Sequence, residues 1–525
     1  MLLTGSQLEH HRNDADEHYF ELTPPLERVL EIEEWAHSIL GVDTKDAMWE
    51  MQMGNLLHNL FFPLDAERRY RHALELDPVN WRPRYTLATM IECPDEAIAL
   101  LKFEVDRFES DENWLRNSKE VFAGILFELG RRYWEKQQHD LAVQFYNRSI
   151  EVDVTGYERA LEIMGQYESE QRWPNIRDAL KIIQNGSEGE TDNLSEMIVQ
   201  VAESEPLHNI LFHAAEEASF IALDQVYRTA IKSASERHMY DMLFYIRYYY
   251  ALSLYQKPEN EDKAVALWES ALKDDLPRSS LNVEATLPNL ILKLGPIYLR
   301  KARSEEQDSD AQTYLQKISR LMPDEAVESS IIFPAKLYLA RYHHVKGDEN
   351  KARQITRSMV KLGLELLSDG EDDSDYTAFR KLLLAFLTLD DEKNAVAASV
   401  LAFLRNRIPH PRSPTDSLPD ESFQYYLAFA DCDGGCGRHL AAGSVMWWCK
   451  DCINIAFDKT CFQKLKEGNL ESRVCDKDHE FLCIPVWDSK RLDAFPRGYV
   501  PVGKEVVSFG DWKRRIRRAY IEFDR

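Results

Sequence analysis

Cysteine residues gather near the C-terminal end of the chain in a pattern that suits metal binding. Seven of the eight cysteines lie between Cys432 and Cys483, and Cys93 stands alone. Six of these seven, with one aspartate and one histidine, form four close pairs: Cys432 with Cys436, Cys449 with Cys452, Asp458 with Cys461, and Cys475 with His479. Two side chains at such a spacing can converge on one ion, and two pairs complete a tetrahedral zinc site. Four pairs therefore predict two sites.

The pattern indicates structural rather than catalytic zinc. A catalytic zinc site keeps one coordination position open and uses three protein ligands. The sequence contains no H-E-x-x-H motif, no H-x-E motif with P-C-x-x-C, and no phosphate-binding G-x-x-x-x-G-K-[ST] loop. We expect the seventh clustered cysteine, Cys483, to be a buried strand residue, because its neighbours are apolar, and Cys93 to be a core thiol.

The cysteine segment resembles the ZZ-type zinc finger over residues 429–485. The resemblance lies in the order of the pairs, the aromatic residue before the second pair and the apolar segment after it. It implies that pairs one and three share one ion, and that pairs two and four share the other. The implied ligands are Cys432, Cys436, Asp458 and Cys461 for the first ion, and Cys449, Cys452, Cys475 and His479 for the second.

Two ligands depart from the ZZ pattern. Asp458 stands where a cysteine is usual, and Cys475 stands where a histidine is usual. Both are competent zinc ligands. Asp458 could equally be a solvated loop residue, in which case the first site would be weak or empty and the module would hold one ion.

ZZ-type modules recognise proteins, and some hold N-terminal or basic peptide tails against acidic side chains. Asp431, Asp433 and Asp451 flank the ligands here. They are either such a recognition surface or ordinary solvated turn residues.

The segment before this module, residues 45–405, consists of amphipathic helices separated by turn signals. Several stretches fit the tetratricopeptide repeat, a helix pair of roughly 34 residues with small residues where its helices meet. The best unit runs from Lys45 to Pro78 and carries Gly54, Ala66, Tyr70 and Ala73 in phase. A second unit carries Gly130, Tyr133, Ala142, Tyr146 and Ser149, and weaker units contain Tyr255, Ala264, Trp268, Ala271 and Pro277, and Gly347 and Ala352.

Stacked helix pairs form a superhelix whose inner face can bind a peptide or a helix. Some such proteins grip a C-terminal carboxylate with Lys, Arg and Asn at fixed first-helix positions. The corresponding positions here are Met51, Asn55 and His58 in one unit, and Phe127, Arg131 and Trp134 in another. We therefore expect a mixed apolar and aromatic groove.

The fold class expected is mainly α, a tetratricopeptide-like superhelix followed by a small α/β zinc-binding module. The expected order is an N-terminal helical extension (1–44), the repeat array (45–405), a proline-rich linker (406–422), the ZZ-like module (423–486) and a C-terminal segment with an amphipathic helix (487–525). Trp512, Ile516 and Tyr520 share one face of that last helix, and we expect this face to dock on the zinc module.

Composition narrows the choice of partner and compartment. The 525 residues carry a net charge of −25, which argues against nucleic acid as the main partner and favours a protein or peptide partner, with a basic surface the better fit. No stretch is long and apolar enough for a secretory signal or a membrane span. We expect an intracellular protein, in the cytoplasm rather than the nucleus, whose oligomeric state the sequence leaves open.

The whole pattern resembles the C-terminal halves of fungal tetratricopeptide and NACHT-type signalling proteins. It implies a non-catalytic scaffold, a sensor or adaptor arm that binds proteins through the array and the module. One alternative is a ubiquitin-ligase-like adaptor, since RING modules also hold two crossed zinc ions, although the middle pair here lacks their Cys-His group. The other is an enzyme with an unrecognised site in the helices, which no motif supports.

Overall fold

The computed structural model of the chain describes residues 46–111, 118–186, 193–217, 222–273, 281–304, 332–367, 372–405, 430–440, 445–471, 473–486 and 498–522, with a few isolated residues besides. The chain forms two compact units, residues 1–242 and 243–525, and each is described here by itself. The proline-rich linker (406–422) and nearly all of the N-terminal extension lie outside the described residues. The boundary at residue 242 divides the array that the sequence predicts to be continuous.

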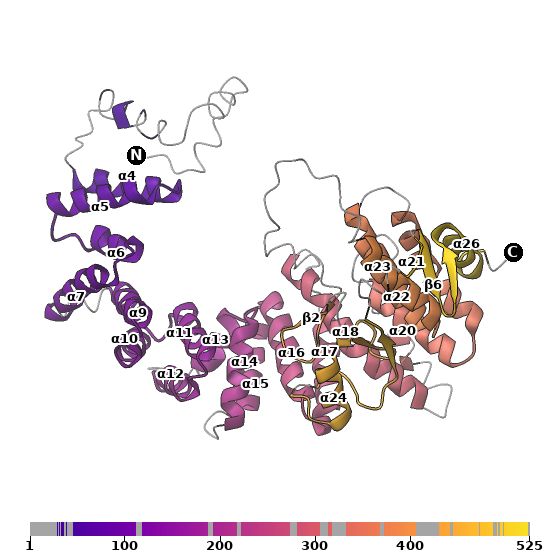
Figure 1. Cartoon of the computed structure of the whole chain (residues 1–525). Helices are drawn as coiled ribbons and strands as arrows, with labels where there is room; N and C mark the ends of the chain where they lie inside the picture. The colour runs from indigo at the N-terminus through magenta and orange to yellow at the C-terminus, as the bar shows by residue number, and fades with distance from the viewer. Residues whose placement is uncertain are drawn as a thin grey trace. The chain divides into compact units, whose positions relative to one another are not determined.

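The first unit is a succession of helices (Figure 1). They are α4 (Ala47–Asn59), α5 (Pro63–Leu76), α6 (Trp81–Met90), α7 (Pro94–Ser110), α9 (Lys119–Glu135), α10 (His139–Val152), α11 (Tyr157–Ser169), α12 (Trp173–Asn185), α13 (Asn193–Gln200), α14 (Glu205–Glu217) and α15 (Leu223–Glu236). Consecutive helices such as α4 and α5, or α9 and α10, pack as antiparallel pairs.

Small residues let the paired helices approach closely, as the repeat pattern predicts. A Cβ atom at Gly54 would lie 2.8 Å from the ring of Tyr70, and one at Gly130 would lie 2.6 Å from Tyr146. Both tyrosines are almost completely buried. Because real Cβ atoms do not come so close to a neighbouring ring, only glycine fits either contact, and the two best predicted units are helix pairs of the tetratricopeptide type.

Several helix pairs escaped the sequence analysis, among them α6 with α7, α11 with α12 and, in the second unit, α22 (Asp372–Thr388) with α23 (Glu392–Arg405). α6 and α7 bury Ala88 and Ala97 at their contact, but they also bury Glu104, which forms an ion pair with Arg84. A charged pair inside a helical hairpin interrupts the apolar period by which the repeat is recognised. Cys93 precedes α7 and is exposed, so the prediction that it is a core thiol is wrong.

The turns inside the pairs share one backbone geometry. The second residue after the first helix has a positive φ, between 54° and 83°, at Phe61, Gln137, Gln171, Gly347 and Asp390. The next residue donates its N–H to a carbonyl five residues earlier, as in Phe62 to Leu57 and Gln138 to Tyr133, both at 2.9 Å. This six-to-one hydrogen bond defines a Schellman cap, and it marks the end of the first helix in each of these pairs.

The second unit continues with helices α16 (Tyr240–Tyr255), α17 (Glu261–Lys273), α18 (Leu281–Ser304), α20 (Ile332–Val345), α21 (Glu349–Leu366), α22 (Asp372–Thr388) and α23 (Glu392–Arg405). Trp268 is fully buried and donates its indole N–H to the Tyr248 carbonyl. The ring of Tyr338 of α20 packs against Gly295 of α18. A Cβ at position 295 would lie 2.2 Å from that ring, so only glycine fits this contact. The second unit therefore has a helical array of its own.

The cysteine-rich module follows the array within the same unit. Its three-stranded antiparallel sheet has the order β4 (Ala456–Phe457), β3 (Met446–Cys449) and β5 (Phe481–Ile484), and helix α24 (Lys459–Glu467) follows β4. A separate pair joins β1 (Ala430–Asp431) to β2 (His439–Leu440). Trp447 stacks on Phe462 with ring centroids 4.1 Å apart. The predicted fold class, a helical array with a small α/β module, is confirmed.

The C-terminal segment forms a hairpin, β6 (Tyr499–Val502) with β7 (Glu505–Ser508), and helix α26 (Phe509–Tyr520). As predicted, Trp512, Ile516 and Tyr520 are its buried face. That face packs on the array, however: Trp512 donates to the Asn394 side chain at 2.9 Å, and the Tyr520 hydroxyl donates to Asp391 at 2.6 Å. The prediction that it docks on the zinc module is therefore wrong.

None of the helices that the structure describes is long and apolar enough to cross a membrane.

Candidate metal centre

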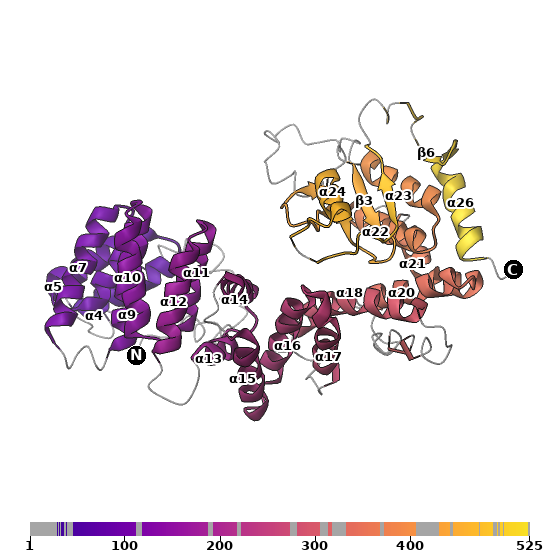
Figure 2. The same ribbon diagram turned by 90° about the horizontal axis from the view of Figure 1, so that it is seen from below.

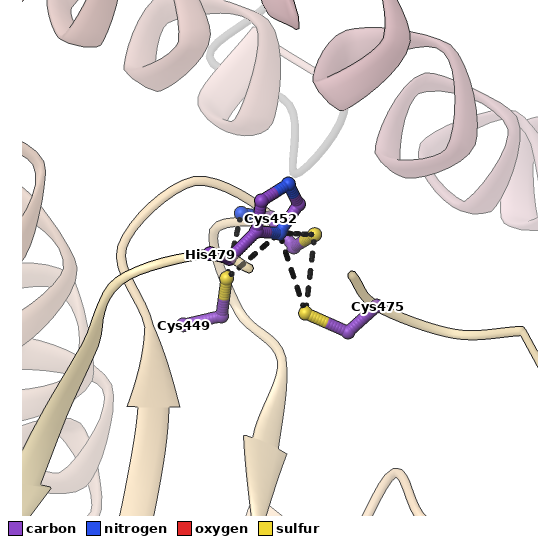
Figure 3. A group of neighbouring side chains, drawn as sticks. All are labelled: Cys449, Cys452, Cys475 and His479. Atoms are coloured by element: carbon purple, nitrogen blue, oxygen red, sulfur yellow. Dashed lines mark hydrogen bonds between the residues drawn. The ribbon is translucent and has the colours of Figure 1, made fainter. Parts of the chain in front are cut away.

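The pairs Cys449–Cys452 and Cys475–His479 converge on one point (Figure 3). Cys449 ends strand β3, Cys452 follows in the next turn, and Cys475 and His479 precede β5. The Cys452 and Cys475 sulfurs are 3.6 Å apart, and His479 Nδ1 lies 3.5, 3.2 and 3.5 Å from the sulfurs of Cys449, Cys452 and Cys475. Zinc bonds of about 2.3 Å to sulfur and about 2.0 Å to nitrogen give tetrahedron edges of about 3.5–3.8 Å. These four side chains are spaced as zinc ligands.

Within this quartet of Cys449, Cys452, Cys475 and His479, the first two residues are buried and the last two are partly exposed. Cys449 is fully buried, and its sulfur accepts the N–H of Cys452 at 3.2 Å. Burial by itself raises the pKa of the Cys449 thiol, but hydrogen bonds with Cys452, Cys475 and His479 lower that pKa well below its usual range. Burial lowers the pKa of His479, but the hydrogen bond with Cys449 and the charges of Cys449, Asp451 and Asp476 together raise it. Hydrogen bonds with Cys449 raise the pKa of Cys452 and Cys475, so Cys449 is the first thiol of the quartet to ionise. A thiolate is the form of cysteine that binds metal.

The pairs Cys432–Cys436 and Asp458–Cys461 form the first quartet. Their four ligand atoms all lie within 4.8 Å of one another, and the Cys436 sulfur is 3.5 Å from Asp458 Oδ2. The loop between the first two cysteines requires glycine, because a Cβ at Gly434 would lie 2.5 Å from the Cys461 sulfur. The run of glycines after Cys432 therefore lets the loop approach the start of α24.

Asp458 has two separate partners for its two oxygens. It caps α24: Oδ1 accepts the N–H of Cys461 at 2.6 Å. Oδ2 faces the Cys436 sulfur and forms an ion pair with Arg438 at 3.0 Å. The residue is 6% exposed, so the alternative that it is a solvated loop residue is wrong. One carboxylate oxygen lies among the other three candidate ligands.

The quartets have the crossed order that the ZZ resemblance implies, with pairs one and three in one group and pairs two and four in the other. Each group offers three thiols and one nitrogen or oxygen. Both could hold a metal ion, and a sulfur-rich tetrahedral set favours zinc among common protein metals. Cys483 belongs to neither quartet; it lies in β5 opposite Trp447.

The three flanking aspartates do not form one acidic surface. Asp451 is buried, and its carboxylate pairs with Arg303 of α18 at 2.7 Å. Asp433 accepts the N–H of Ala456 at 2.8 Å, and burial raises its pKa to about 6. Asp431 alone is largely exposed, and it contacts His439. Neither alternative holds for all three residues: they do not form one recognition surface, and Asp451 is not a solvated turn residue.

Contacts from the array surround the turn that carries Cys449 and Cys452. Asn454, which has a φ of +76°, accepts from Arg380 of α22 at 2.6 Å, and the Tyr338 hydroxyl donates to the carbonyl of Cys452 at 2.9 Å. Lys450 pairs with Glu392 at 2.7 Å. The sequence analysis missed these array residues, because they lie far from the turn in the sequence and no local pattern points to them.

Comparison with known proteins adds one fold-level likeness. No family model matches the sequence, and no curated protein matches it. Among solved structures, the chain is similar to the TPR domain of P58(IPK), with 13% identity over 69% of this chain and 93% of that one, and a TM-score of 0.19. The assignment of tetratricopeptide-like pairs rests on the glycine contacts and the recurrent turns described above.

Proposed function

We propose that the chain is a non-catalytic protein-interaction scaffold whose C-terminal module holds two structural zinc ions. The observation that carries the proposal is the crossed arrangement of two thiol-rich quartets in a module with few strands of its own. The ligands would be Cys432, Cys436, Asp458 and Cys461 for one ion, and Cys449, Cys452, Cys475 and His479 for the other. Zinc cross-links such loops, so metal binding stabilises modules that are too small to bury a sufficient core.

The scaffold role rests on the inner face of the first unit. Arg131 and the half-buried Phe127 occupy expected groove positions on α9, and Arg131 pairs with Glu128 and Glu135. Gly165 of α11 has open space where a Cβ would be. A glycine in a helix interior costs about 0.5–1 kcal/mol relative to alanine, and here no packing contact explains it. A helical surface that carries aromatic and charged side chains suits a protein segment, and the chain's net charge of −25 favours a basic one.

Native mass spectrometry of the intact chain tests the metal assignment. We expect two zinc ions per chain. A chelator should remove both ions and thereby destabilise the module. A purified chain that carries no zinc and acquires none from added zinc would contradict the assignment.

Affinity capture from a cell extract tests the scaffold role. We expect Phe127→Ala to reduce the recovery of specific partners about tenfold, the usual effect of truncating an interface aromatic residue. Leu141→Ala is the control, because Leu141 is exposed on the second helix of the same pair. Equal recovery with both variants would exclude the inner face of α9 as the binding surface.

A further inference from the structure

The left-handed turn residues allow groove positions to be compared between the two units. Counting back six residues from the turn residue gives Asn55 and Arg131 in the first unit, and Arg341 of α20 in the second. Counting back ten gives Phe127 in the first unit and Arg380 of α22 in the second. Arg341 and Arg380 therefore lie on the surface of the second unit that corresponds to the expected groove of the first.

In the second unit this surface contacts the cysteine module. Arg380 donates to Asn454 at 2.6 Å, and Arg341 lies 3.9 Å from Asp451. Figure 2 shows the module alongside α22 and α23. Where the first unit has its candidate groove, the second unit binds a segment of its own chain.

The contact extends to the candidate metal ligands. Tyr338 is fully buried with its ring against Gly295, so its hydroxyl has a fixed position and donates to the carbonyl of Cys452 at 2.9 Å. Asp451, beside Cys452, pairs with Arg303 through one oxygen and accepts the N–H of Glu480 through the other at 3.4 Å. Glu480 follows His479, so Asp451 links two ligand-bearing segments.

The Cys475 segment is also attached to the array. Arg473, two residues before Cys475, pairs with Glu261 of α17 at 2.8 Å and lies over the ring of Tyr255 at 4.5 Å. Its own N–H donates to the side chain of Gln256 at 2.8 Å. The segments that carry Cys452, Cys475 and His479 are thus held, directly or through Asp451, by helices far away in the sequence.

We propose that the array forms part of the second metal site, with Tyr338, Arg303 and Arg473 as positioning residues for Cys449, Cys452, Cys475 and His479. The inference rests on the proposed function, because it requires that this quartet binds zinc. Groups that orient metal ligands commonly change metal affinity ten- to a hundredfold. Since coupling free energies are reciprocal, metal binding at this quartet also stabilises the array helices that hold it.

The first test measures zinc release from the full-length chain to a chromophoric chelator. Tyr338→Phe removes one hydroxyl and leaves the ring against Gly295. We expect one of the two zinc ions to leave ten to a hundred times faster, while the other leaves at its original rate and serves as an internal reference. Tyr298→Phe is the matched control, since that hydroxyl donates to Glu269 of the array at 2.8 Å.

A second variant tests the same inference in case Tyr338→Phe fails to fold. Arg303→Gln breaks the ion pair with Asp451 at a partly exposed position, and Lys301→Gln breaks a comparable pair with Asp262 inside the array. We expect only Arg303→Gln to accelerate zinc release. Release rates within twofold of the controls for both Tyr338→Phe and Arg303→Gln, or equal acceleration of both ions, would overturn the inference while leaving the zinc assignment intact. An original chain without zinc would overturn both.

Hydrogen exchange tests the reciprocal effect. We expect chelation to accelerate amide exchange in α20, whereas α9 of the first unit exchanges as before. Unchanged exchange in α20 after complete zinc removal would contradict the coupling.

Discussion

At the scale of single residues, Asp458 combines two roles that usually fall to different side chains. One oxygen caps α24 and the other lies among the candidate ligands of the first quartet. A cysteine at this position could supply a ligand atom, but it would cap the helix poorly. The ligand and the cap can therefore be separated by mutation.

We expect Asp458→Ala to reduce the zinc content from two ions to one and to cost a further ~1 kcal/mol through loss of the helix cap. Asp458→Cys should retain two ions and lose only the cap. Native mass spectrometry gives the stoichiometry, and denaturant unfolding gives the stability. Two ions retained in Asp458→Ala would show that Asp458 is not an essential ligand.

His208 is a second residue whose chemistry follows from its surroundings. Its side chain is fully buried; Nδ1 lies 2.5 Å from the Tyr227 hydroxyl, and Nε2 lies 2.9 Å from the Ala202 carbonyl. Burial lowers its pKa from 6.5 to about 4. The folded protein therefore keeps this imidazole neutral under conditions in which the unfolded chain protonates it.

Because the folded pKa of His208 is depressed, its stabilising contribution is present above pH 6.5 and is lost as the pH falls toward 4. The loss amounts to about 3 kcal/mol for the first unit. Urea unfolding between pH 7.5 and 4.5 measures it. His208→Gln should be less stable at pH 7.5 and should lose less stability on acidification than the original chain; an equal loss in both would assign the pH dependence to other groups.

At the scale of elements, the turns inside the helix pairs show how far backbone geometry can depart from residue preference. Four of the five left-handed turn residues listed above are not glycine. A left-handed conformation costs a non-glycine residue roughly 1–2 kcal/mol. The six-to-one hydrogen bond and the packing of the two helices outweigh this cost, so most of these turns carry no sequence signal.

We expect Gln137→Gly to stabilise the first unit by up to about 1 kcal/mol, since relief of the left-handed strain exceeds the added entropy of an unfolded glycine. Gln137 is exposed, so little side-chain contact is lost. Gly347→Ala is the reverse test: a Cβ there would meet nothing within 4 Å, and we expect a backbone penalty of about 1 kcal/mol. Thermal unfolding measures both. A destabilised Gln137→Gly would show that its side chain makes a stabilising contact.

The candidate ligands could be predicted from sequence because their pairing is local. Cys449 and Cys452, or Cys475 and His479, are close enough in the chain that their spacing alone indicates convergence. The contacts of Asp451 with Arg303 and of Cys452 with Tyr338 join residues 148 and 114 positions apart, and no local pattern encodes them. For the same reason, the amphipathic face of α26 was recognisable from its period, while the surface that it covers was not.

At the scale of the whole molecule, the two compact units differ in their expected dependence on metal. The array helices of the second unit hold the module, and the first unit contains neither quartet. Removal of zinc should therefore weaken the second unit, including its helices, rather than unfold the module alone.

We expect heating to give two unfolding transitions, of which a chelator lowers one by roughly 10 °C. This corresponds to about 4 kcal/mol of binding free energy at a zinc concentration a thousandfold above the dissociation constant. Differential scanning calorimetry measures the shift, and added zinc should reverse it. His208→Gln should move only the other transition, which identifies it as that of the first unit. A chelator that shifts both transitions equally would contradict this division.

The two units differ in how far apart in the sequence their contacting residues lie, and this difference affects how the chain folds during synthesis. In the first unit, polar contacts such as that of Tyr70 with Asn55 or Arg132 with Ala88 join residues 15 and 44 positions apart. In the second, Arg473 reaches Glu261 across 212 positions. Domains fold from the N-terminus as the ribosome advances, so the first unit can complete its contacts during translation. The helices of the second unit can complete their contacts with the module only after residues 430–486 have emerged, so the surface that the module covers stays exposed to solvent until then.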